Sequence, residues 1–192
     1  MPREEVEWFF QSVAKAAKDP VTNLAPRFEV ELNAILAYRQ SRASVDWKSS
    51  SPQFVSLPLT TPTLPEIMGA PATTLTGFPL FASPGIETDL WGGMKADVLF
   101  FTEDRRHVVL IEGKVDSCFT YGDYPPDAQL WRQLEFLASL KHDTKTLVLL
   151  CPRFNLNWYM SRLTRAWQYR ALPGRVFACL IPWEDLLHIN AS

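Results

Sequence analysis

Two carboxylates and a lysine stand inside apolar segments in the middle of the chain. Asp97 lies in the segment 96–102, and Glu112 and Lys114 lie in the segment 107–115. Burying two carboxylates side by side is costly unless a cation compensates them. Mg²⁺, or Mn²⁺ in its place, suits this task because it takes oxygen ligands and keeps other positions for water and phosphate. A lysine beside such a metal can orient or help to deprotonate an attacking water, so these residue types predict phosphodiester hydrolysis.

The spacing of the three residues predicts that they meet on one face of a β-hairpin. The polar segment 103–106 separates the two apolar segments and has the composition of a turn. If the turn is centred in the middle of this segment, Asp97 falls opposite Glu112, with Cβ atoms about 4.5–5.5 Å apart. Lys114 follows two residues later, so the pleat directs it to the same face. The alternative, that these are ordinary charges of an exposed strand, is disfavoured by the uniformly apolar run 108–111, which is typical of a central strand.

Helices and further strands flank the hairpin in the sequence. The apolar spacing predicts helices at 2–18 and at about 26–41. After the hairpin we expect a helix at 127–140, a strand at 146–151, a helix at 155–169, a strand at 175–181 and a short helix at 182–188. This alternation predicts an α/β fold with a central mixed β-sheet of about four to five strands flanked by helices.

One stretch of the first half is rich in proline. Seven of the 15 prolines lie within residues 42–95, and an interior proline removes a helical hydrogen bond and clashes with the preceding turn. We therefore expect an ordered, proline-rich insertion in a single domain that covers residues 1–192. Within it, Phe54–Leu59 and Thr76–Phe81 could each form a short strand, and we expect one of them to pair with the sheet.

Asp97, followed by Glu112-Gly113-Lys114 at the end of the next strand, resembles the PD-(D/E)xK nuclease superfamily. The resemblance covers about residues 26–181 and implies a restriction-endonuclease-like core in the order helix, three strands, helix, strand. It also implies that Asp97 and Glu112 bind the metal and that Lys114 is the catalytic lysine. Residue 96 is Ala where the family name has Pro, a position that varies, and the proline-rich segment is longer than in the minimal core.

The resemblance extends to residues of the flanking helices. The metal-binding glutamate that some members carry in the first helix corresponds to Glu31 or Glu29. We favour Glu31, because helical neighbours at i−3 and i+4 place it beside the buried face. The glutamine that some members carry after the lysine strand corresponds best to Gln129, with Gln133 one turn later as a substitute.

Composition limits the compartment and the partners. Three widely spaced cysteines without a CxxC pattern disfavour a disulfide framework and a zinc site. The N-terminus is acidic, and no apolar run approaches the ~20 residues that span a bilayer. We therefore expect a cytoplasmic protein without a membrane partner. The three histidines are scattered along the chain, and we expect them to be surface residues.

The predicted partner is nucleic acid, DNA rather than RNA. The net charge of −2 gives no overall basic surface, so binding must come from a local patch. Gln133, Arg162 and Arg165 are the candidates for such contacts, although the two arginines also fit an ordinary solvated helix face. The low charge also keeps open a second function, a non-catalytic binding or assembly module that acts as a subunit of a nucleic-acid-processing or defence complex. A homodimer or a larger complex fits either function.

Overall fold

The computed structural model describes seven segments of the chain. These are residues 29–41, 45–50, 52–55, 63–79, 95–115, 128–168 and 176–188. The helix predicted at 2–18 lies outside the described residues. No helix within these segments is long and apolar enough to cross a membrane.

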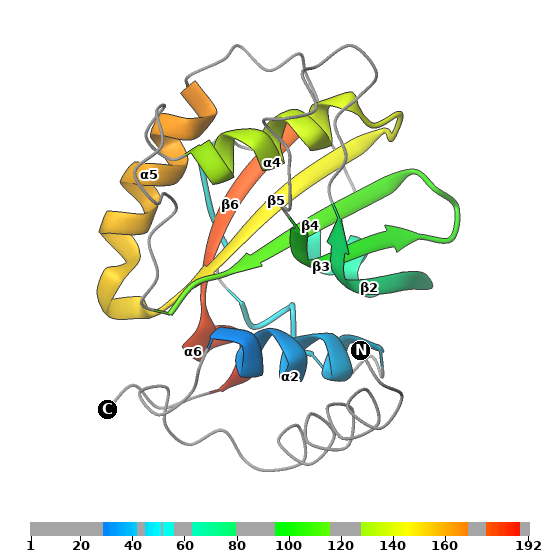
Figure 1. The fold of residues 1–192 in the computed structure, drawn as a ribbon. Coiled ribbons are helices and arrows are strands. Elements are labelled where there is room, and N and C mark those ends of the chain that lie inside the picture. Colours follow the sequence, from blue (N-terminus) through cyan, green and yellow to red (C-terminus); the bar gives the residue numbers. More distant parts are fainter. Residues whose placement is uncertain are drawn as a thin grey trace, which may run out of the picture.

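A six-stranded mixed sheet forms the centre of the structure (Figure 1). Its strands, in spatial order, are β1 (Gln53–Phe54), β6 (Val176–Pro182), β5 (Thr144–Cys151), β4 (His107–Gly113), β3 (Lys95–Thr102) and β2 (Ala72–Pro79). Strands β2, β3 and β4 form an antiparallel meander, β4, β5 and β6 run parallel, and β1 pairs antiparallel with β6. The α/β class and the mixed sheet were therefore predicted from the sequence.

The six strands of the described residues exceed the predicted four to five because part of each segment proposed in the proline-rich region pairs with the sheet: Phe54 lies in β1, and residues 76–79 lie in β2. β1 and β2 occupy its two edges, where a strand with proline at its end is tolerated. Pro79 is the last residue of β2, so the missing N–H does not interrupt the ladder. The insertion also contains a short helix, α3 (Leu64–Met68), which has Pro65 in its first turn, where proline costs no helical hydrogen bond.

Helices cover both faces of the sheet. α2 (Glu29–Ser41) and α6 (Trp183–Leu187) lie on one side, and α4 (Ala128–Ser139) and α5 (Leu156–Gln168) lie on the other (Figure 1). A 3₁₀ turn, η2 (Arg153–Asn155), precedes α5. Leu32, Ile35 and Leu36 bury the apolar stripe of α2 against one sheet face, and Leu130, Leu134 and Leu163 bury those of α4 and α5 against the other.

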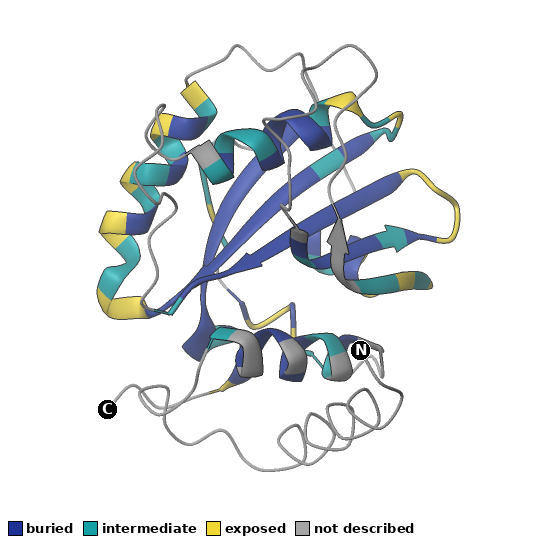
Figure 2. Cartoon of the chain, in the orientation of Figure 1, coloured by how far each residue is buried: buried dark blue, intermediate teal, exposed yellow. Residues whose placement is uncertain are grey.

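The central strands are buried on both faces. All seven residues of β4 and of β6 are buried, and the exposed positions lie on the turns, on the outer sides of the helices and on the edge strands (Figure 2). Parallel strands covered by helices on both faces have this apolar character. A charged residue inside β4 is therefore removed from water unless it lies at the end of the strand.

Candidate metal centre

The β3–β4 hairpin has the predicted register. Val98 pairs with Ile111, so Asp97 and Glu112 are the next opposed positions on the two strands. One oxygen of Asp97 accepts a hydrogen bond of 2.9 Å from the Gly113 backbone N–H. This contact fixes the carboxylate at the carboxyl end of β4.

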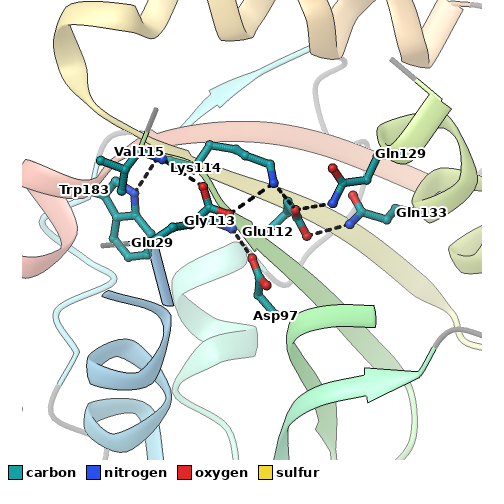
Figure 3. Close-up of polar contacts among 9 residues, drawn as sticks. All are labelled: Glu29, Asp97, Glu112, Gly113, Lys114, Val115, Gln129, Gln133 and Trp183. Carbon is teal, nitrogen blue, oxygen red and sulfur yellow. Dashed lines mark hydrogen bonds and ion pairs between the residues drawn. The ribbon is translucent and has the colours of Figure 1, made fainter. Parts of the chain in front are cut away.

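A third carboxylate comes from the first residue of α2. Oxygens of Glu29, Asp97 and Glu112 lie within 4.8 Å of one another, and we call these three residues the carboxylate cluster (Figure 3). Glu29 accepts a hydrogen bond of 3.2 Å from the Val115 backbone N–H. The structure thus brings Glu29 to the site, whereas the side chain of Glu31, which the sequence argument favoured, lies outside the described residues.

Lys114 supplies the positive charge beside the cluster. Its Nζ lies 2.7 Å from Oε1 of Glu112 and 3.3 Å from Oε1 of Glu29. Burial alone would lower the pKa of Lys114, but the neighbouring carboxylates outweigh that effect and hold the pKa above its ordinary value. Lys114 is therefore protonated at neutral pH and acts as a cation.

Both strand carboxylates are destabilised as anions. Glu112 is 1% exposed, and burial, together with the negative charge of Asp97, raises its pKa to about 7 in spite of Lys114. Burial also raises the pKa of Asp97, against the favourable hydrogen bond from Gly113. Because both pKa values rise through lost hydration and through repulsion from a neighbouring carboxylate, Glu29 for Asp97 and Asp97 for Glu112, a second cation at the cluster would stabilise the ionised forms.

Two glutamines of α4 hold Glu112 in place. Gln129 Nε2 donates to Oε1 over 2.5 Å, and Gln133 Nε2 donates to Oε2 over 2.7 Å. The two residues are one helical turn apart and so share a face of α4. Both predicted glutamines therefore contact the site. Gln133 has no exposed surface, which assigns it to the carboxylate cluster rather than to an exposed nucleic-acid surface.

Two further residues that were not predicted from the sequence contact the site. The side chain of Asn33 hydrogen-bonds to Asp97, and its Oδ1 is buried without a hydrogen-bond partner among the described residues. Trp183 Nε1 donates to the Lys114 carbonyl over 3.0 Å. Asn33 lies four residues after Glu29, a helical spacing that could have identified it. No sequence pattern marks Trp183, which arrives from the end of β6.

Steric crowding requires glycine at position 113. A Cβ atom built on it would lie 2.1 Å from Asn33 Oδ1 and 2.7 Å from Trp183 Cζ2. Both distances are far below a van der Waals contact. Glycine between Glu112 and Lys114 therefore lets α2 and α6 approach the strand that carries the site.

The other predicted candidates lie elsewhere. Arg162 and Arg165 are on α5, and the Arg162 guanidinium lies 4.8 Å from the centre of the Trp158 ring. The prediction of surface histidines was wrong for His107, which is 7% exposed and whose ring contacts the Thr144 hydroxyl. It begins a central strand, so the neighbouring strand and loops cover it.

The oxygen donors of the cluster fit a hard divalent cation such as Mg²⁺ or Mn²⁺. Three carboxylates face one protonated lysine, so the site has an excess of negative charge when all of them are ionised. Comparisons with known proteins add no assignment: no protein-family model matches the chain, and no curated protein matches it.

Proposed function

We propose that this protein is a metal-dependent nuclease that hydrolyses phosphodiester bonds of DNA and belongs to the PD-(D/E)xK superfamily. The observation that carries the proposal is the convergence of Glu29, Asp97 and Glu112 with Lys114, from three separate elements, at the end of a buried strand. Structural ion pairs rarely require three carboxylates around one lysine, since the uncompensated charge is costly.

The order of the elements supports the restriction-endonuclease-like core. α2 precedes the antiparallel meander β2–β3–β4, with β1 and the short helix α3 between them, and α4 then leads to β5, parallel to β4. Apart from β1 and α3, this is the order helix, three strands, helix, strand that the resemblance implies. Asp97 and Glu112 lie on its second and third meander strands, and Lys114 directly follows the third, as the resemblance also implies.

Glu29, Asp97 and Glu112 would hold the metal, and each would contribute a carboxylate oxygen. When bound there, a divalent cation lowers the pKa of a ligated water and neutralises charge that develops on the phosphate. The Gly113 N–H and Asn33 orient Asp97. These contacts keep the ligand oxygens in place before the substrate arrives.

Lys114 has a defined role in this scheme. Because the surrounding carboxylates raise its pKa, it remains a cation and does not take a proton from water. Its ammonium donates hydrogen bonds, so it orients the attacking water and stabilises negative charge on the phosphate oxygens. Gln129 and Gln133 donate hydrogen bonds to the Glu112 carboxylate and so keep it beside Lys114.

The test is cleavage of plasmid, linear duplex and single-stranded DNA with Mg²⁺ or Mn²⁺. Glu112→Gln and Lys114→Met should each reduce the rate by about 100-fold or more, since positioned groups of this kind contribute that much. Glu103→Gln and Lys141→Met remove the same charges at exposed positions and should leave the rate unchanged. Equal cleavage by wild type and the two site variants would overturn the proposal.

One observation favours a second candidate, a module of the same fold that binds or assembles without cutting. Both oxygens of Glu112 already accept hydrogen bonds, from Lys114, Gln129 and Gln133, so part of its coordinating capacity is engaged by the protein itself. This candidate predicts no cleavage with either metal. It also predicts that Glu112→Gln and Lys114→Met leave biological activity intact.

A further inference from the structure

Two large apolar side chains are exposed at the start of α5. Phe154 is 75% exposed and Trp158 is 40% exposed. They are four residues apart, and Arg162 and Arg165 continue the same flank of the helix. We call these four residues the α5 stripe. The buried side of this helix consists of other residues, Tyr159, Leu163 and Ala166, so the stripe lies outside that buried side.

The charge around the stripe is unlike that of the whole chain. Between residues 144 and 183 the sequence has no Asp or Glu, but it has one lysine and five arginines, whereas the chain as a whole carries a net charge of −2. Within the stripe, the Arg162 guanidinium lies over the Trp158 ring. Two exposed rings followed along the helix by two cations fit a polyanion that has flat apolar groups.

The stripe begins near the carboxyl ends of β4 and β5, which is the end of the sheet where the carboxylate cluster lies. Lys114 donates its backbone N–H to the Leu150 carbonyl over 2.8 Å, across the carboxyl ends of β4 and β5. β5 ends at Cys151, and η2 begins two residues later. The start of α5 therefore lies at the end of the strand next to the one that carries Glu112 (Figure 1).

We propose that the α5 stripe binds single-stranded DNA and so defines the substrate class of the carboxylate cluster, an inference that rests on the proposed nuclease function. Unpaired bases stack on the rings of Phe154 and Trp158, and Arg162 and Arg165 contact phosphates. Stacking on aromatic side chains requires bases whose faces are open, as in a single strand. In a duplex those faces are already covered by neighbouring base pairs.

The experiment measures binding of a fluorescein-labelled oligo(dT) by fluorescence anisotropy in EDTA, so that no cleavage occurs. Phe154→Ala and Trp158→Ala should each weaken binding by roughly tenfold or more. Trp158→Phe keeps a ring and should retain most of the affinity, whereas Trp158→Leu keeps only the apolarity and should not. Asn157→Ala, at an exposed position of the same helix, is the matched control and should bind like wild type.

The phosphate contacts of the two arginines are tested by the salt dependence of DNA binding. Arg162→Gln and Arg165→Gln should each reduce the slope of log affinity against log salt by about 0.7, the value for one phosphate contact of a single strand. Unlabelled oligo(dT) should compete better than the corresponding duplex. Wild-type affinity in the two alanine variants, full affinity in Trp158→Leu, or equal competition by duplex would overturn the inference. Stripe-dependent self-association without DNA binding would overturn it as well.

Failure of this inference and failure of the nuclease proposal give different results. Binding is measured without metal, so it does not depend on cleavage by the carboxylate cluster. If the wild type cleaves DNA with Mg²⁺ and the alanine variants of the stripe cleave and bind equally well, only the stripe is refuted. If no variant cleaves but oligo(dT) binding depends on the rings, the nuclease proposal is refuted and with it the substrate class of the cluster, whereas binding of single-stranded DNA by the stripe stands.

Discussion

In protein stripped of divalent metal, the free energy of unfolding should fall as pH rises from about 4.5 to about 7, because Glu112 is buried. Its ordinary pKa of 4.5 is raised to about 7 in the folded chain. Below both pKa values the carboxyl is protonated in the folded and unfolded states, and its contribution to stability is complete. Between them the unfolded chain loses its proton first, so folding is progressively disfavoured. The rise in pKa corresponds to about 3 kcal/mol, lost by the time the pH exceeds the folded value.

Other groups affect the same curve with known signs. Burial raises the pKa of Asp97, so it adds a decrease of the same direction. Burial lowers the pKa of His142, which makes stability rise with pH through the range where that histidine titrates. Subtracting the curve of Glu112→Gln removes the His142 contribution and isolates the pH dependence that belongs to Glu112.

The assay is urea unfolding followed by tryptophan fluorescence, in EDTA, at several pH values between 4 and 8.5. We expect the wild-type curve to fall by about 3 kcal/mol relative to that of Glu112→Gln. The exposed Glu103→Gln serves as the control and should follow the wild type. Excess Mg²⁺ at pH 8 should recover about 2.7 kcal/mol when its concentration is about 100 times the dissociation constant. Parallel curves for wild type and Glu112→Gln would refute the reasoning.

Three further substitutions test the packing around the site. Gly113→Ala should lower the free energy of unfolding in urea by about 1–3 kcal/mol because its Cβ would overlap Asn33 Oδ1. The Cβ of Gly69→Ala would lie 3.3 Å from a backbone oxygen, so this control should lose clearly less stability. Asn33→Ala should weaken Mn²⁺ binding measured by calorimetry because Asp97 loses an orienting hydrogen bond, and unchanged affinity would exclude that role. Glu184→Ala should lower the free energy of unfolding by about 1–3 kcal/mol, because the Glu184 carboxylate accepts a hydrogen bond from the backbone N–H at the start of η2. Glu184→Gln keeps a hydrogen-bond acceptor, so an equal loss in both variants would contradict this assignment.

The hairpin was predictable because its register depends on local information. A polar turn between two apolar strands fixes which residues face one another, and the period of two then fixes the shared face. Asp97, Glu112 and Lys114 could therefore be placed from their spacing alone, and the structure confirms that they meet. The apolar face of α2 was predictable for a similar reason, since helical periodicity identifies its buried residues.

The remaining parts of the site depend on how distant elements dock. Glu29 reaches the cluster because α2 meets the end of β4 with its first turn, and helical periodicity says nothing about which end of a helix lies at a strand end. Trp183 arrives from the carboxyl end of β6, 69 residues after Lys114. Both edge strands overlap segments that the sequence marked as possible strands, although only one was expected to join the sheet. Proline is compatible with a strand only at its ends or at the sheet edge, and the local pattern does not show which segments reach an edge.

The measurement that tests the central claim most directly is the anomalous diffraction signal of crystals grown or soaked with Mn²⁺. We expect an ion bound by carboxylate oxygens of Glu29, Asp97 and Glu112, at metal–oxygen distances of about 2.1 Å, with Lys114 Nζ beside it and not among its ligands. The ion should be absent from crystals of Glu112→Gln. Fully occupied Mn²⁺ at another position, or none at the cluster when Mn²⁺ is in excess, would contradict the account.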